Sequence, residues 1–387
     1  MSPPTRTARW LRSPRASFPP STVRPIPVTP SAPLARRRNS LSSALGLGEK
    51  LFSSASERKF ATAIEDGLDQ VETGLLAQVS FADDLADVTT RYLLDAGGKR
   101  VRPTLALLTA QLGTGNTPEV LIAAEALEIT HLASLYHDDV MDEAGMRRGV
   151  PSAQNVWGNS VAILTGDLLF ARASKLMSGL GERAIMLQAN TFERLCLGQL
   201  HETIGPRDGE DPIDHYIQVL ADKTGSLIAA AAEMGVIFGN APEEYGTPVK
   251  VFGEKIGVAF QLIDDVIDLA DGEEETGKTP GTDLRSGVAT LPLLYLRDLA
   301  KTDLDAADLL TRIERDVNAA HYSPEDPDEA ELARAIAELR GHHVTQKTLA
   351  EARRWAREAV EALAPLPGGP VKKALTRFAE SVVERSN

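Results

Sequence analysis

The chain has 387 residues, of which 43% are hydrophobic, 25% are charged and 5% are aromatic, so it is long enough to bury a sizeable core. Its formal net charge of −14 argues against broad non-specific binding to nucleic acid, whose phosphates repel an acidic surface. The single cysteine, Cys196, excludes a disulfide framework within the chain and fits a reducing, intracellular location. It lies between Leu195 and Leu197, which predicts a buried structural thiol. No uninterrupted apolar run reaches the ~18 residues of a membrane span.

Residues 1–40 contain nine Pro and eight Arg but no Asp, Glu or Lys, and this composition cannot bury enough apolar surface to fold. We therefore predict a disordered extension at 1–44 and a single helical domain at 45–387. Arg and Ser without acidic residues resemble an organelle transit peptide. Because the prolines oppose an amphipathic helix, a dispensable tail or an over-extended gene start is preferred, and the protein is expected in a bacterial cytoplasm.

From residue 45 onward the pattern is helical, and no stretch shows sustained strand alternation, so the expected fold class is all-α. Apolar residues recur at spacings of three and four in 85–94, 119–141 and 251–269. Clusters containing Gly or Pro divide the helical segments at 97–98, 113–118, 179–181, 205–211 and 239–242. After an acidic, proline-containing loop at 322–330, helices are expected near 329–341, 346–363 and 369–385.

The first chemically informative segment is Gly97-Gly98-Lys99-Arg100-Val101-Arg102-Pro103. It lies between a predicted helix that ends near Asp95 and one that begins near Pro103, a residue suited to a first helical position. Lys99 and Arg102 beside a helix N-terminus would form an anion site that needs no metal. The alternative is a basic capping loop with two exposed charges.

One acidic motif occurs twice, as Asp-Asp-Val-Met-Asp at 138–142 and Asp-Asp-Val-Ile-Asp at 264–268, each time at the end of an apolar helical stretch. The first and last aspartates of each motif share a helix face. Like charges at that spacing repel unless a cation lies between them, and Mg²⁺ prefers carboxylate oxygens. Two such helices facing across a cavity would hold several Mg²⁺ ions around one diphosphate. The alternative, a solvated acidic face, accounts less well for two matching copies.

Basic side chains and a histidine accompany the first of these clusters. Arg147 and Arg148 lie just beyond Asp142, where an anion would account for them because Arg contacts phosphate bidentately. Charge balance of the acidic cluster is the alternative, and both can hold. His131 lies two helical turns before Asp138 on the same face, so it either donates to a diphosphate oxygen or is a core residue.

Together these motifs resemble those of the trans-isoprenyl (polyprenyl) diphosphate synthases, and of bacterial medium- and long-chain members in particular. The resemblance covers roughly residues 45–385. The matching segments are GGKRVRP (97–103), HLASLYHDDVMDEAGMRRG (131–149), GD (166–167), KTGSLIAAA (223–231), FQLIDDVIDL (260–269) and GKTPGTDLRSGVATLPLLY (277–295). One position departs from many relatives, which have Lys where Val288 follows Gly287. The resemblance implies a large helical bundle around a deep central cavity, and a homodimer.

The resemblance also implies roles for individual residues in the condensation of isopentenyl diphosphate with an allylic diphosphate. The expected metal ligands, for about three Mg²⁺ ions per site, are Asp138, Asp142 and Asp264. The residues expected to support them are Asp139, Asp265 and Asp268. The allylic diphosphate would be held by Arg147, Lys223, Thr224, Gln261 and Lys278, and isopentenyl diphosphate by Lys99, Arg102, His131 and Arg148. The six aspartates and Lys223 form the expected catalytic set.

The expected reaction is ionisation of the allylic diphosphate, condensation, and proton loss to the departing diphosphate, in a dry cavity. The growing tail would run from Asp138 along its own helix. Ala133 and Ser134 lie there and are small, whereas in this family aromatic residues at these positions cap short products. Phe170 is a candidate lower floor. We therefore expect a linear product of roughly C30–C50, with C20 as the alternative, and such chains commonly become quinone side chains. Peripheral membrane association would aid product release.

Other classes of protein compete with this interpretation. A class I terpene cyclase also has an aspartate-rich metal site, but it normally has one DDxxD motif and no need for Lys99, Arg102 and Arg148. A non-catalytic partner subunit of a heteromeric synthase would tend to lose one acidic motif, and this chain keeps both. A purely structural helical scaffold explains neither cluster. Consumption of isopentenyl diphosphate by the purified chain alone separates these classes.

Overall fold

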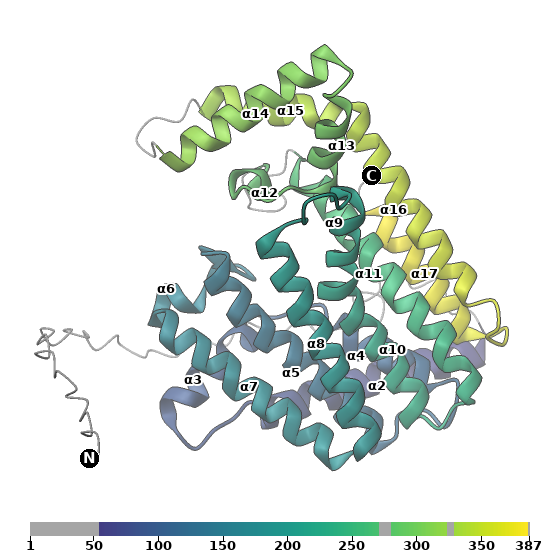
Figure 1. Ribbon diagram of the computed structural model, residues 1–387. Coiled ribbons are helices and arrows are strands. Elements are labelled where there is room, and N and C mark those ends of the chain that lie inside the picture. Colours follow the sequence, from purple (N-terminus) through teal and green to yellow (C-terminus); the bar gives the residue numbers. More distant parts are fainter. Residues whose placement is uncertain (1–53, 271–279, 323–328, 386–387) are drawn as a thin grey trace, which may run out of the picture. The chain divides into compact units, whose positions relative to one another are not determined.

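The computed structural model describes residues 54–270, 280–322 and 329–385, all of which belong to one of the two units into which the chain divides, Arg37–Asn387. These residues are almost entirely helical, so the all-α prediction is confirmed (Figure 1). The extension predicted at 1–44 lies outside the described residues. No helix in the described ranges is both long enough and apolar enough to cross a membrane.

In the first half of the described chain, each predicted Gly or Pro cluster coincides with a break between helices, and the breaks at 79–83 and 142–152 were not predicted. The helices are α2 (Ala55–Gln78), α3 (Asp84–Asp95), α4 (Val101–Ala110), α5 (Pro118–Met141), α6 (Ala153–Trp157), α7 (Asn159–Gly179) and α8 (Glu182–Ile204). Two short strands, β1 (Met146–Arg147) and β2 (Val150–Pro151), pair antiparallel between α5 and α6. The helical pattern did not predict this hairpin.

The second half of the described chain continues in the same way. Its elements are α9 (Pro212–Leu220), the π-helical turn η2 (Ala221–Gly225), α10 (Ser226–Phe238), the 3-10 turn η3 (Glu243–Tyr245), α11 (Gly246–Asp268), α12 (Thr282–Arg285), α13 (Leu291–Leu299), α14 (Leu304–Tyr322), α15 (Glu329–Gly341), α16 (His343–Ala362) and α17 (Pro370–Glu384). The last three helices lie where the sequence predicts them. Residues 323–328 of the predicted acidic loop lie outside the described residues.

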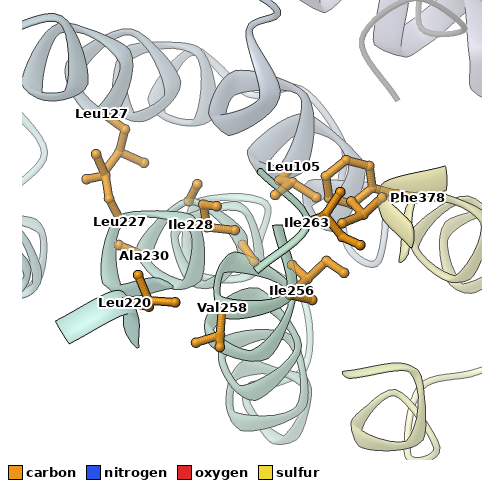
Figure 2. Packing of buried hydrophobic residues seen from close by; sticks show 14 of the residues in the cluster. Leu105, Leu127, Leu220, Leu227, Ile228, Ala230, Ile256, Val258, Ile263 and Phe378 are labelled. Atoms are coloured by element: carbon orange, nitrogen blue, oxygen red, sulfur yellow. The ribbon is translucent and has the colours of Figure 1, made fainter. Parts of the chain in front are cut away.

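The core is organised around α10, which packs against α4, α5 and α11. An apolar helix of this kind is stable only when it is buried all round, and nearly all of its residues are buried. Figure 2 shows part of this core, with Leu105 of α4, Leu127 of α5, Leu227 of α10, Ile263 of α11 and Phe378 of α17. Since α5 and α11 end in the two acidic motifs, α10 holds both acidic helices in one core.

Candidate functional site

The first carboxylate cluster lies at the C-terminal end of α5, as predicted. The Asp142 N–H donates to the carbonyl of Asp138 at 2.8 Å, so the two residues are one helical turn apart. Asp138 is half-buried and Asp142 is exposed. The pKa of Asp138 is raised to about 6, mainly by burial; Asp142 and Glu202 raise it as well, whereas Lys223 and Arg147 oppose them. A carboxylate crowded by like charges favours a bound cation.

Asp139, the middle residue of the first cluster, is turned into the protein. It is fully buried, and Arg147 Nε donates to its Oδ1 at 2.6 Å. Its Oδ2 is buried without a hydrogen-bond partner. The charge-balance interpretation of Arg147 therefore holds, and its role toward an allylic diphosphate stays a prediction.

The second cluster, at the end of α11, contains one carboxylate that is held by neighbouring elements. Asp265 is buried, and its Oδ2 accepts from the Tyr216 hydroxyl of α9 at 2.8 Å and from the Leu291 N–H of α13 at 3.3 Å. Burial raises its pKa to about 8. Asp265 therefore joins three elements at the second cluster, and Tyr216 is a partner that the motifs did not predict.

The other two aspartates of the second cluster are half-buried. Asp264 Oδ1 lies 3.6 Å from Arg385 Nη1, and the guanidinium of Arg385 also lies 4.8 Å from the centre of the Phe260 ring. Asp268 Oδ2 accepts from the Asp283 N–H at 3.1 Å. Sequence reasoning missed Arg385, because no motif marks the end of α17.

Lys223, predicted from the KTG segment, lies in η2 and faces the first cluster. Its Nζ donates to Glu202 Oε2 of α8 at 2.5 Å. Although burial lowers the pKa of Lys223, the charges of Glu202, Asp138 and Asp142 raise it overall. Glu202 also contributes to the raised pKa of Tyr216, so this carboxylate lies within range of both clusters. Sequence reasoning missed Glu202.

Of the other residues expected to hold the allylic diphosphate, Thr224 and Gln261 are half-buried, on η2 and α11. Lys278 lies outside the described residues. The roles of all three stay predictions.

Arg102, Arg148 and His131, three of the four residues expected to hold isopentenyl diphosphate, lie within electrostatic range of one another. Burial holds the pKa of His131 well below its ordinary value, and the charges of Arg102 and Arg148 lower it further. Its imidazole is therefore neutral and can donate one hydrogen bond. Burial lowers the pKa of Arg102 to about 10, and Arg102 Nε is buried without a partner. Glu128 lies among these cations and also has one buried oxygen, Oε2, without a partner.

Arg148 reaches this group because of the hairpin. Arg148 (φ 53°) and Gly149 (φ 78°) connect β1 to β2, and two positive φ values are typical of the tight two-residue turn that joins antiparallel strands. Arg148 Nη1 donates to the carbonyl of Leu93 at 2.7 Å and to that of Gly97. The turn therefore fixes the guanidinium against the Gly97-Gly98 loop.

The helix after this loop begins at Val101, and the predicted start near Pro103 was wrong. Arg100 takes a left-handed conformation (φ 52°) immediately before the helix. Its buried guanidinium donates to Glu72 at 2.8 and 3.0 Å and to Glu128 at 3.3 Å. Arg100 therefore lies at the boundary between the loop and the helix, with its side chain directed into the protein.

Lys99, in contrast, is exposed. Burial and then Arg385 lower its pKa, while Asp264 opposes them. Lys99 therefore lies within range of the second carboxylate cluster. Its predicted contact with isopentenyl diphosphate stays a prediction.

Cys196 is exposed, so the prediction of a buried thiol was wrong. Of its two apolar neighbours on α8, Leu195 is buried but Leu197 is 42% exposed. The prediction failed because α8 has exposed apolar side chains as well as buried ones. Partial desolvation of the thiol and then the charge of Asp138 raise the pKa of Cys196.

The predicted chain-length residues lie on α5 and α7. Ala133 and Ser134 are buried, and Ser134 Oγ donates to the His131 carbonyl at 2.9 Å. The ring of Phe170 packs against His137, with centroids 5.4 Å apart, and against Phe192 of α8 at 4.5 Å. Phe170 therefore joins α5 to α8, and its role as a floor stays a prediction.

No three His, Cys, Asp or Glu side chains within the described ranges already converge as a metal cage. The donor set nevertheless fits a hard divalent cation, because carboxylate oxygens of this kind are its preferred ligands. The negative charges of Asp142 and Glu202 lie close enough to Asp138 to raise its pKa. The buried Oδ2 of Asp139 has no hydrogen-bond partner. A cation between Asp138 and Asp142 would relieve the repulsion between these carboxylates.

Comparisons with known proteins agree with these features. Residues 83–323 match the family described as Polyprenyl synthetase. Nonaprenyl diphosphate synthase of Mycobacterium tuberculosis is 40% identical over 327 residues, which cover 84% of this chain and 94% of that protein. The structure of a decaprenyl diphosphate synthase from Rhodobacter capsulatus has a TM-score of 0.73 at 32% identity, covering 86% of this chain and 99% of that one. Geranylgeranyl pyrophosphate synthase from Corynebacterium glutamicum, solved with calcium and isoprenyl diphosphate, has a TM-score of 0.72 at 39% identity, covering 86% and 98%.

Proposed function

Because the chain belongs to the polyprenyl synthetase family, we propose that it condenses isopentenyl diphosphate head to tail with an allylic diphosphate, giving a linear all-trans polyprenyl diphosphate of roughly C30–C50. The family match and the relatives confirm the resemblance seen in the sequence and the prenyltransferase class expected from the motifs. One observation carries the proposal. The carboxylate cluster beside Lys223 and the cationic group of Arg102, Arg148 and His131 consist of different side chains with opposite charge. Two anion sites of different kinds suit two diphosphate substrates, whereas a cyclase needs one.

Asp138, Asp142 and Asp264 would hold Mg²⁺ in this enzyme, with Asp139, Asp265 and Asp268 supporting them. The bound ions would neutralise the allylic diphosphate as it leaves. Divalent-metal dependence is supported by related structures solved with calcium and isoprenyl diphosphate, since calcium also prefers oxygen ligands. The identity of the metal as Mg²⁺ and the number of about three ions belong to the proposal.

The side chains around these carboxylates bind and orient the two substrates. Lys223 and Arg147 contact the allylic diphosphate, together with Thr224, Gln261 and Lys278. Arg102 and Arg148 bind the diphosphate of isopentenyl diphosphate, and the neutral imidazole of His131 donates one further hydrogen bond. The departing diphosphate takes the final proton.

Ala133 and Ser134 set the product length in this proposal. A growing tail that starts at Asp138 passes these small residues along α5. Ala133 is fully buried, so a larger side chain at this position has to project into neighbouring space. Ala133→Phe should therefore shorten the main product by two or more isoprene units (roughly C10). An unchanged length in a folded, active variant would show that Ala133 does not line the path.

The test of the function is incubation of the purified chain with farnesyl diphosphate, labelled isopentenyl diphosphate and Mg²⁺, followed by chromatography of the dephosphorylated products. Products of roughly C30–C50 are expected, and EDTA should abolish their formation. No consumption of isopentenyl diphosphate would reject the prenyltransferase. A sole C15 or C20 product would reject the length argument.

A C20 product is the second candidate, because the geranylgeranyl pyrophosphate synthase from Corynebacterium glutamicum is 39% identical in sequence. The long-chain product is preferred because the nonaprenyl, octaprenyl and heptaprenyl relatives also match over most of their length. The same assay separates the two products.

The protein is expected to act as a homodimer in the cytoplasm. Support for the dimer comes from large apolar side chains on the adjacent helices α7 and α8 that are exposed in the single chain. Peripheral association with a membrane for release of the apolar product belongs to the same proposal.

A further inference from the structure

The turn that carries Lys223 and Thr224 has an unusual backbone. At the end of η2, the Ser226 N–H donates to the carbonyl of Ala221, five residues earlier, which is the π-helical pattern. Such turns are rare, and their hydrogen-bond geometry is less favourable than that of an α-helix. They persist where the surrounding structure holds them. The contacts that hold η2 therefore decide where Lys223 lies.

Arg194 of α8 makes polar contacts with both η2 and α11. Its Nε donates to Asp222 Oδ1 at 2.7 Å, and its Nη1 donates to Glu254 Oε2 of α11 at 2.7 Å. One guanidinium thus joins three elements, α8, η2 and α11. Charge-assisted bonds of this length are among the stronger hydrogen bonds in proteins.

Asp222, the residue before Lys223, is held on several sides. Its Oδ2 accepts from Gln218 Nε2 at 2.8 Å, and its carbonyl accepts from the Ser226 hydroxyl at 2.6 Å. With Arg194 on Oδ1, both carboxylate oxygens and the carbonyl of Asp222 have partners. Any change of the Asp222 rotamer would break at least one of the hydrogen bonds to its carboxylate.

The restraint on Asp222 extends to the backbone of η2, because glycines allow α8 and α11 to contact that backbone directly. A Cβ at Gly198 of α8 would lie 2.6 Å from the backbone nitrogen of Lys223. A Cβ at Gly257 of α11 would lie 2.6 Å from the Cα of Gly225. No side chain lies between these backbones to absorb a shift, so a displacement of Asp222 displaces Lys223 as well.

We propose that Arg194 is a positioning residue for the allylic diphosphate, acting by holding η2 so that Lys223 Nζ stays beside Glu202 and the first carboxylate cluster. The inference rests on the proposed function, in which Lys223 binds that diphosphate. Lysine at position 194 would not replace arginine, because a single ammonium lacks the planar fork that reaches two carboxylates.

The test is steady-state kinetics of Arg194→Met with the full chain, varying each substrate in turn. The KM for the allylic diphosphate should rise about tenfold, while the KM for isopentenyl diphosphate stays within about twofold, because Arg102 and Arg148 do not contact η2. Arg194→Lys should show an intermediate rise. In Arg194→Ala, millimolar guanidinium ion should lower the allylic KM again, which a general loss of packing would not allow.

The matched control is Lys255→Met. Lys255 of α11 pairs with Glu358 of α16 at 2.6 Å, and its exposure (27%) resembles that of Arg194 (33%), but this ion pair joins α11 to α16 and not to η2. Both KM values should be unchanged in this variant.

An unchanged allylic KM in folded Arg194→Met, or equal rises in both KM values without guanidinium rescue, would overturn the inference while the proposed function stands. If Arg194→Met does not fold, Arg194→Lys decides by the same criterion. A wild-type chain that consumes no isopentenyl diphosphate would reject both.

Discussion

Two arginines that are neighbours in the sequence have opposite situations in the protein. Arg100 has its charge balanced by Glu72 and Glu128. Arg102, two residues further along the chain, has a buried Nε without a partner. An unsatisfied buried donor costs about 1–3 kcal/mol. We interpret Arg100 as a structural residue and Arg102 as one whose partner is a substrate anion.

Glu125 on α5 is a buried carboxyl group outside the proposed site, and burial raises its pKa to about 7. Its folded pKa therefore exceeds its ordinary value of 4.5. The contribution of this group to the free energy of unfolding is fully present below pH 4.5. It is lost as the pH rises from 4.5 to 7, because Glu125 ionises first in the unfolded chain. Glu125→Gln removes this loss, so its advantage over wild type should grow by about 3 kcal/mol from pH 4.5 to pH 8.

This difference is read from thermal unfolding of both proteins at the two pH values. Groups of the site titrate in both proteins, so their contribution cancels. Glu244→Gln is the control for removal of a negative charge, since Glu244 is exposed on η3. An advantage of Glu125→Gln that does not change with pH would contradict the assignment.

At the scale of elements, the Gly97-Gly98 loop depends on the absence of a side chain. Gly98 has φ +150°, and a Cβ there would lie 2.5 Å from Arg100 Nη1 and 3.1 Å from Arg148 Cζ. Gly98→Ala should therefore destabilise the protein by about 1–3 kcal/mol and displace Arg148. The KM for isopentenyl diphosphate should rise about tenfold.

Gly246→Ala is the matched control for this loop variant. Gly246 begins α11 with φ −59°, and no atom lies within 4 Å of a Cβ built there. Alanine at that position should leave both KM values unchanged and stabilise the chain slightly, by about 0.4–1 kcal/mol. Equal kinetics for Gly98→Ala and wild type would show that the loop does not place Arg148 for substrate binding.

The sequence was sufficient for the helices and for the acidic motifs, because apolar periodicity and i,i+4 spacing are local properties. It was insufficient for the partners of the motifs. Glu202 and Arg194 lie on α8 without a motif, and only the packing of α8 against η2 brings them to Lys223. The hairpin that aims Arg148 depends on two positive φ values, and the pattern of helices does not predict them.

At the scale of the whole described chain, the adjacent helices α7 and α8 have apolar side chains that are exposed to solvent. The exposed apolar side chains on α7 and α8 are Ile163, Leu164, Leu168, Ile185, Met186, Leu197, Leu200 and Ile204. Soluble monomers rarely expose contiguous apolar patches larger than a few hundred Å² (order of magnitude). The proposed homodimer would cover this face, since a stable interface buries about 800 Å² per partner.

Leu164→Glu tests the dimer. Leu164 is 60% exposed on α7, so glutamate is tolerated in the single chain, but a charge buried at an apolar interface without a partner is strongly unfavourable. Light scattering after gel filtration should show a dimer for wild type and, for the variant, a monomer or a dimer weakened at least tenfold. Leu304→Glu is the control, because Leu304 is 88% exposed on α14, outside this face, and should leave the dimer intact. A monomeric wild type, or a variant that dimerises as wild type does, would contradict the assignment of this face. Since the proposed site of each chain is built from its own α5, η2 and α11, the monomeric variant should retain part of its activity.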